Sequence, residues 1–138
     1  MSSAEIFNRF VRAIYDHDVS AITALMTADH LFVNSLGQPV RGAAAMQAGW
    51  KGYFAMCPDY WLRTDTVLAQ EEIVLGTGEA GGTTNGVAWS TPAAWKATIR
   101  DGAISEWRVF ADNKPVYDIL AKSSPDELTP RATTRESR

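Results

Sequence analysis

Cysteine and histidine are scarce in this sequence, which has one cysteine, Cys57, and two histidines among 138 residues. A single cysteine cannot form a disulfide within the chain and is compatible with the reducing cytoplasm, where we expect the protein. One cysteine and two histidines at wide spacing do not form a metal-ligand motif. The sequence also lacks a glycine-rich phosphate loop, so we expect neither a metal nor another cofactor.

Positive charge and long apolar runs are scarce as well. Lys and Arg number 13 against 16 Asp and Glu, which gives a net charge of −3. No basic run is present to neutralise phosphates, so we expect no nucleic-acid partner. No apolar stretch reaches the roughly 18–20 residues of a membrane span, and the first residues do not resemble a secretory signal. We therefore expect a soluble, acidic protein that is not attached to a membrane.

The hydrophobic share of 46% is ordinary for a globular protein, and the length fits one domain. The stretch that begins at Lys122 differs, because it is rich in Ser, Thr, Pro and charge and has one large apolar residue, Leu128. Such a stretch cannot bury enough surface to offset the entropy of ordering it. We predict a domain over residues 1–121 and a disordered tail over residues 122–138.

Apolar spacing predicts helices in the first half of the chain. Ile6, Phe10 and Ile14 lie four residues apart, and Ser2 and Glu5 have the spacing of a capping box. This pattern predicts a first helix up to about residue 15. The further elements predicted here are a short helix over 19–26, a brief strand over 31–34 and a helix over 43–56.

The second half predicts strands, over residues 60–69, 73–80, 87–100 and 103–111, with a flexible loop over 81–86. Asp101-Gly102, between two apolar stretches, is a strong signal for a tight hairpin. Helices followed by a run of antiparallel strands predict an α+β fold. In it, a curved antiparallel sheet wraps around three N-terminal helices.

Three segments, residues 15–22, 32–42 and 104–112, resemble the nuclear transport factor 2-like superfamily. This superfamily includes ketosteroid isomerases, limonene epoxide hydrolases and SnoaL-like polyketide cyclases. The resemblance covers nearly the whole predicted domain and implies a cystatin-like cone with a deep pocket. It also implies a homodimer through the outer sheet face, whose outward-facing residues are Lys96, Thr98, Arg100, Arg108 and Phe110.

The residues that ketosteroid isomerases use for catalysis are missing at the positions that the resemblance implies. The carboxylate base falls on Asn34, the phenol on Phe10 and the protonated acid on Trp95. An amide cannot take up a proton near neutral pH, and a phenylalanine has no hydroxyl. The resemblance therefore implies the fold without this reaction.

The relay of the limonene epoxide hydrolases is missing too. Its Arg and neighbouring Asp fall on Gly78 and Ala80, and its second Asp falls on Val109. Of two helper residues, the Asn matches Asn34 and the Tyr falls on Phe32. The resemblance to the polyketide cyclases assigns no catalytic acid or base to a position of this sequence. The sequence therefore names no catalytic residue.

Strand alternation and the resemblance together predict a pocket lined mainly by aromatic side chains. The predicted lining residues are Phe10, Phe32, Asn34, Trp50, Tyr53, Trp95, Trp107 and Val109. The tryptophans either form an aromatic box for a flat, apolar ligand or fill the cone as core. Asn34 either anchors a ligand or bonds to its own loop.

Several other residues have two interpretations. Tyr53 and Tyr60 either offer phenol donors to the pocket or have satisfied hydroxyls. His30 either approaches the pocket mouth or is structural. Cys57 is interpreted as buried filler, and Asp112 as an acceptor of backbone N–H groups after the last strand.

These features support three hypotheses of function. The first is a protein that binds a small hydrophobic molecule, with any chemistry of the isomerase, cyclase or lyase kind. The second is a non-catalytic binding or accessory protein on the same fold. The third is a protein–protein interaction module, against which the implied deep pocket weighs.

Overall fold

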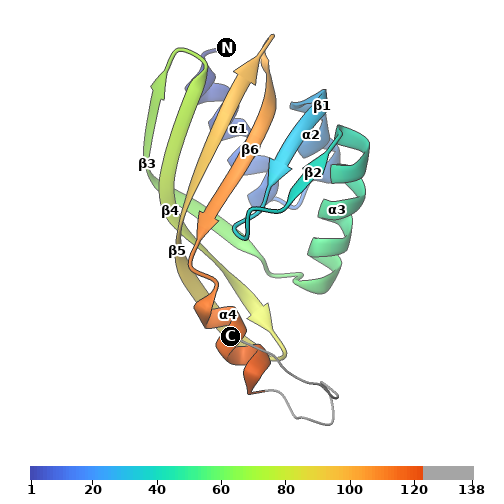
Figure 1. Cartoon of the computed structure of the whole chain (residues 1–138), viewed down its shortest axis with the longest axis vertical. Coiled ribbons are helices and arrows are strands. Elements are labelled where there is room, and N and C mark those ends of the chain that lie inside the picture. Colours follow the sequence, from blue (N-terminus) through green and yellow to red (C-terminus); the bar gives the residue numbers. More distant parts are fainter. Residues whose placement is uncertain (123–138) are drawn as a thin grey trace.

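Helices come first along the chain and a run of strands follows, as the sequence predicts (Figure 1). The computed structural model describes residues 1–122. The elements are α1 (Ser3–Tyr15), α2 (Val19–Ala24), β1 (Met26–Val33), β2 (Pro39–Arg41), α3 (Ala43–Met56), β3 (Trp61–Gln70), β4 (Ile73–Thr84), β5 (Val87–Arg100), β6 (Ala103–Ala111) and α4 (Lys114–Ala121). Apart from Lys122, the predicted tail lies outside the described residues, so the boundary at residue 121 stays a prediction.

Helix α1 begins where the capping box predicts. The Ser2 hydroxyl accepts from the Glu5 N–H at 3.1 Å, and the Glu5 carboxylate accepts from the Ser2 N–H at 2.7 Å. These bonds satisfy backbone donors that the first turn of a helix leaves free. The apolar stripe of α1 is buried against the sheet, including Ile6, Phe10 and Ile14.

The six strands form one curved sheet in the order β2-β1-β6-β5-β4-β3 (Figure 1). All neighbouring strands are antiparallel except β1 and β6, which run parallel. The predicted α+β fold, a curved sheet on N-terminal helices, is confirmed. Register places Phe32 beside Trp107, and Trp95 beside Val109, on the face that the helices cover.

The first half of the chain departs from the prediction near β1. This strand begins at Met26 rather than at residue 31, and α2 ends at Ala24. Residues 39–41 form the edge strand β2, where the prediction has only turn residues. Leu25 and Met26 continue the apolar helical spacing of α2, but pairing with β6, a partner far away in the sequence, decides their conformation.

The predicted flexible loop at 81–86 is wrong for its residues 81–84. Strand β4 continues to Thr84, and Gly81 pairs with Trp61 on one side and Ser90 on the other. The turn lies instead at Asn85-Gly86, which both have positive φ values. A Cβ on Gly81 would lie 2.5 Å from the Trp61 ring, so this glycine permits close packing within a strand.

Helix α4 is an element that the sequence analysis does not predict. It begins with Pro115 in its first turn, where proline is well tolerated. In the described part of the chain, no helix has the length and apolar character needed to cross a membrane.

Candidate functional site

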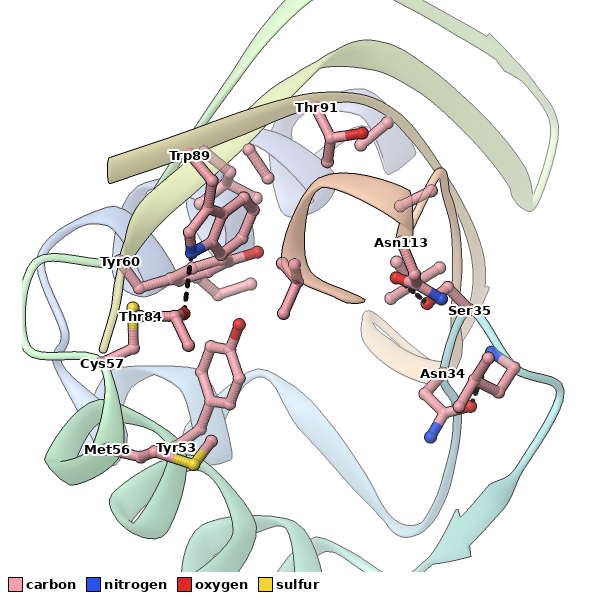
Figure 2. Close-up of a pocket in the computed structure, with 18 of the residues that line it drawn as sticks. Asn34, Ser35, Tyr53, Met56, Cys57, Tyr60, Thr84, Trp89, Thr91 and Asn113 are labelled. Atoms are coloured by element: carbon pink, nitrogen blue, oxygen red, sulfur yellow. Dashed lines mark hydrogen bonds between the residues drawn. The ribbon is translucent and has the colours of Figure 1, made fainter. Parts of the chain in front are cut away.

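A cavity of about 600 Å³ opens between the concave face of the sheet, α3 and α4 (Figure 2). This volume lies within the usual range of small-molecule pockets. Its lining is mostly apolar and comes from distant parts of the chain. Residues that contribute include Phe32 from β1, Trp50 from α3, Leu62 from β3, Trp95 from β5, Val109 from β6 and Leu120 from α4.

Seven of the eight predicted pocket residues line this cavity, namely Phe32, Asn34, Trp50, Tyr53, Trp95, Trp107 and Val109. Phe10 does not, which corrects the prediction for this residue. It is fully buried beneath the cavity wall, with its ring centroid 4.6 Å from that of Trp107. The α1 stripe points Phe10 directly at the sheet, where it serves as core.

The tryptophans belong to the core and to the cavity wall at once. Trp95 and Trp107 are 2% and 1% exposed, and Trp50 is 8% exposed. All three nevertheless line the cavity. They therefore do not fill the cone, and an open space remains above them.

Asn34 lies at the mouth of the cavity, where its side chain is occupied by its own loop. Its Oδ1 accepts from the backbone N–H groups of Leu36 and Gln38, both at 2.9 Å. Its Nδ2 donates to Gln38 Oε1 at 3.0 Å. This geometry matches the interpretation of Asn34 as a turn residue, because the carbonyl oxygen already has two donors.

Tyr53 from α3 and Tyr60, just before β3, meet edge to face with ring centroids 4.9 Å apart. Figure 2 shows both hydroxyl groups pointing into the open centre of the pocket. Burial raises the pKa of Tyr53 to about 12. Burial also raises the pKa of Tyr60, and the neighbouring Tyr53 raises it further. Both phenols are therefore protonated at neutral pH and available as donors.

The segment that carries Tyr60 is held from two sides. His17 Nε2 lies 2.6 Å from the Tyr60 carbonyl oxygen and must carry the proton, because a carbonyl can only accept. The His17 ring also stacks on Phe54 of α3, with centroids 4.0 Å apart. Asp59 accepts from the Thr83 N–H at 3.0 Å and from the Thr83 hydroxyl at 2.5 Å.

The other titratable groups near the cavity have structural roles. Cys57 is 4% exposed, and burial raises the pKa of its thiol, which agrees with its interpretation as filler. Asp112 Oδ1 accepts from the Lys114 N–H at 2.9 Å, as predicted. Within residues 1–122, no three His, Cys, Asp or Glu side chains gather closely enough to hold a metal ion.

His30 does not approach the pocket mouth. It is completely buried, and its Nδ1 donates to the Ile104 carbonyl oxygen at 2.8 Å. Burial lowers the pKa of this imidazole below its usual value of 6.5. Its Nε2 is buried without a hydrogen-bond partner, so the neutral form is the one that the fold accommodates.

The positions that correspond to the epoxide hydrolase relay cannot carry it. Glu79, the acidic residue between the relay positions Gly78 and Ala80, forms an ion pair with Arg63, and neither of these two charged residues borders the cavity. At Gly78, a Cβ would lie 1.9 Å from the Arg63 carbonyl oxygen. No side chain fits at the position that the resemblance assigns to the relay arginine.

The sequence analysis missed the contribution of α4 to the site. Val116, Tyr117 and Leu120 border the cavity from this helix. The signal was present, because Val116 and Leu120 lie four residues apart after a proline suited to a helix start.

The family model of the SnoaL-like domain matches residues 7–107. This chain belongs to the SnoaL-like domain family. The match spans most of the sheet and the helices that cover it, and it ends before α4. The resemblance to the nuclear transport factor 2-like superfamily is thereby confirmed. A comparison with curated protein sequences finds no match.

Solved structures of similar fold confirm the architecture. A candidate SnoaL-like polyketide cyclase from Shewanella denitrificans is 11% identical with a TM-score of 0.78, covering 88% of this chain and 98% of the other. An NTF2-like protein from Burkholderia thailandensis is 17% identical with a TM-score of 0.79, covering 87% and 98%. TerC, co-crystallised with polyporic acid, is 17% identical with a TM-score of 0.77, also covering 87% and 98%. At these identities the likeness concerns the fold alone.

Proposed function

We propose that this SnoaL-like protein binds a small, mostly apolar ring compound in the cavity between the sheet, α3 and α4. The observation that carries the proposal is an open cavity of about 600 Å³ with a mainly apolar lining that includes several tryptophans. Flat apolar surfaces bind well against aromatic side chains, with a few polar groups fixing orientation. That TerC was co-crystallised with polyporic acid supports a ligand role for this fold.

Any reaction in this cavity would use hydrogen bonding rather than a charged acid or base. The ionisable side chains that line the described cavity are Tyr53, Cys57, Tyr60, Asp112 and Tyr117. The carboxylate among them, Asp112, is bonded to the backbone of the next helix. Isomerisations, cyclisations and eliminations of a carbonyl compound are the reactions that such a site suits.

The test uses fluorene, a flat hydrocarbon, in equilibrium dialysis with the full chain. We expect saturable binding of one fluorene per chain and a rise in Tm. Ala111→Phe adds a ring to the cavity lining and should weaken binding about tenfold or more. Ala45→Phe is the matched control, because Ala45 is an exposed α3 residue that does not line the cavity.

Two results would overturn the proposal. One is a wild-type protein that does not bind fluorene saturably, and the other is equal binding by the Ala111→Phe and wild-type proteins. Clear ketosteroid isomerisation by the wild type would contradict the absence of a charged base. We expect none above background, because Asn34 and Phe10 cannot perform the required steps.

An interaction module on the same fold is the second candidate function. The outer sheet face favours it, because Leu68, Leu75 and Phe110 are 69%, 51% and 50% exposed there. Exposed apolar side chains gathered on one face are typical of association surfaces. If the protein binds no ring compound but associates through this face, the interaction module becomes the first candidate function.

A further inference from the structure

Tyr53 and Tyr60 line the cavity side by side, and neither hydroxyl makes a hydrogen bond within the described chain. They come from different elements, α3 and the segment before β3, and their rings are in contact. Neither hydroxyl is among the fully buried polar atoms of the described chain that lack a partner, so both are open to the cavity and free to donate to an atom that enters it. Two such groups side by side in an apolar cavity therefore suggest a ligand atom that accepts from them.

Several other polar groups around the cavity already have partners, although the buried Trp50 Nε1 has none within the described chain. Thr91 Oγ1 donates to the Asp112 carbonyl oxygen at 2.7 Å, and Ser35 Oγ donates to Asn113 Oδ1 at 3.0 Å. Trp89 Nε1 donates to Thr84 Oγ1 at 2.9 Å. These bonds shape the mouth and the wall (Figure 2).

The position of Tyr60 is fixed independently of any ligand. The His17 bond to its carbonyl oxygen and the Asp59 bonds to Thr83 anchor the segment on both sides. Tyr53 lies against Trp50 as well, edge to face, with ring centroids 6.3 Å apart. Donors that are held in place before a ligand arrives lose little entropy when it binds.

We propose that Tyr53 and Tyr60 bind one carbonyl oxygen of the ligand, so that the ligand class is an aryl ketone or quinone rather than a plain hydrocarbon. A carbonyl oxygen has two lone pairs and can accept from two phenols at once. This inference rests on the proposed binding of ring compounds.

The experiment compares 9-fluorenone with fluorene, which has the same ring system without the oxygen. We expect the wild type to bind fluorenone more tightly than fluorene. Tyr53→Phe and Tyr60→Phe should each weaken fluorenone binding about 3- to 10-fold, the scale of one net hydrogen bond. Neither variant should change fluorene binding, because the phenyl ring that remains fills the same space.

Tyr15→Phe is the matched control, because Tyr15 is an exposed residue of α1 away from the cavity. A second measurement needs no variant. The infrared carbonyl band of fluorenone bound to the wild type should lie at lower frequency than in hexane, and Tyr60→Phe should move it back towards the hexane value.

The outcomes separate the two proposals. The tyrosine inference is overturned if fluorene and fluorenone bind equally, if neither Tyr variant changes fluorenone binding, and if the carbonyl band stays at its hexane position. The proposed binding of ring compounds would still stand in that case. If neither compound binds, the proposed function itself is overturned and the inference with it.

Discussion

The ring of Phe10 packs against the indole of Trp107, with centroids 4.6 Å apart and planes tilted by 51°. Both side chains are buried, so the contact forms part of the wall on which the cavity rests. The resemblance assigns a catalytic phenol to Phe10, but this position is packed core. The phenol groups of Tyr53 and Tyr60, by contrast, do line the cavity.

Asn34 is predicted to support its loop through its carbonyl oxygen. Asn34→Leu removes the acceptor of two backbone N–H groups and should lower the free energy of unfolding by about 1 kcal/mol, since the loop is partly exposed. Asn34→Asp is the control, because it keeps an oxygen at that place and should cost much less. Urea titration measures both, and equal losses would contradict the role of this oxygen.

Gly78 should tolerate no side chain. In Gly78→Ala the new Cβ would meet the Arg63 carbonyl oxygen at 1.9 Å, which we expect to cost about 3 kcal/mol of stability. Gly52→Ala is the control, because nothing lies within 4 Å of that Cβ and alanine favours a helix. Thermal unfolding of the two variants checks the difference. A Gly78→Ala protein as stable as wild type would show that β3 and β4 lie further apart than described.

His30 should make the protein less stable as the pH falls below the usual histidine value of 6.5. The folded chain holds this imidazole neutral, with a lowered pKa, whereas the unfolded chain takes up a proton at the ordinary value. The stabilisation is therefore complete above pH 6.5 and declines as the pH falls towards the lowered, folded-state pKa. Urea titrations between about pH 7.5 and about pH 5.5 measure it.

A His17→Gln variant provides the control for this dependence. His17 is the second histidine, so a pH dependence that persists in His17→Gln belongs to His30. Nitrogen NMR should also show His30 as the neutral tautomer with its proton on Nδ1. A charged His30 at pH 6.5 in the folded protein would contradict the prediction.

The outer sheet face is predicted to form a homodimer. Phe110 of β6 is half exposed, and Leu75 of β4 lies on the same face with β5 between them. Phe110→Glu places a charge there and should convert a dimer at micromolar concentration into a monomer, as measured by sedimentation. Tyr15→Glu, on an exposed part of α1, should leave the dimer intact. A monomeric wild type would remove the prediction.

The candidate site was predictable where a local pattern determines which way a side chain points. Alternation along β5 and β6 places Trp95, Trp107 and Val109 on the inner face, and the cavity borders all three. The partner bonds of Asn34 and the free hydroxyls of Tyr53 and Tyr60 were not predictable, because each depends on which groups lie nearby after folding.

The sequence by itself determined the elements that local chemistry controls. The capping box starts α1, and Asp101-Gly102 forms the predicted tight turn, with positive φ at both residues. Only the tertiary structure decided that β1 pairs in parallel with β6, that β4 continues through 81–84 and that Phe10 is core instead of pocket. The tertiary structure also decided that the cavity is open. The volume of the cavity depends on the separation of the sheet, α3 and α4, and contacts between residues distant in sequence set that separation.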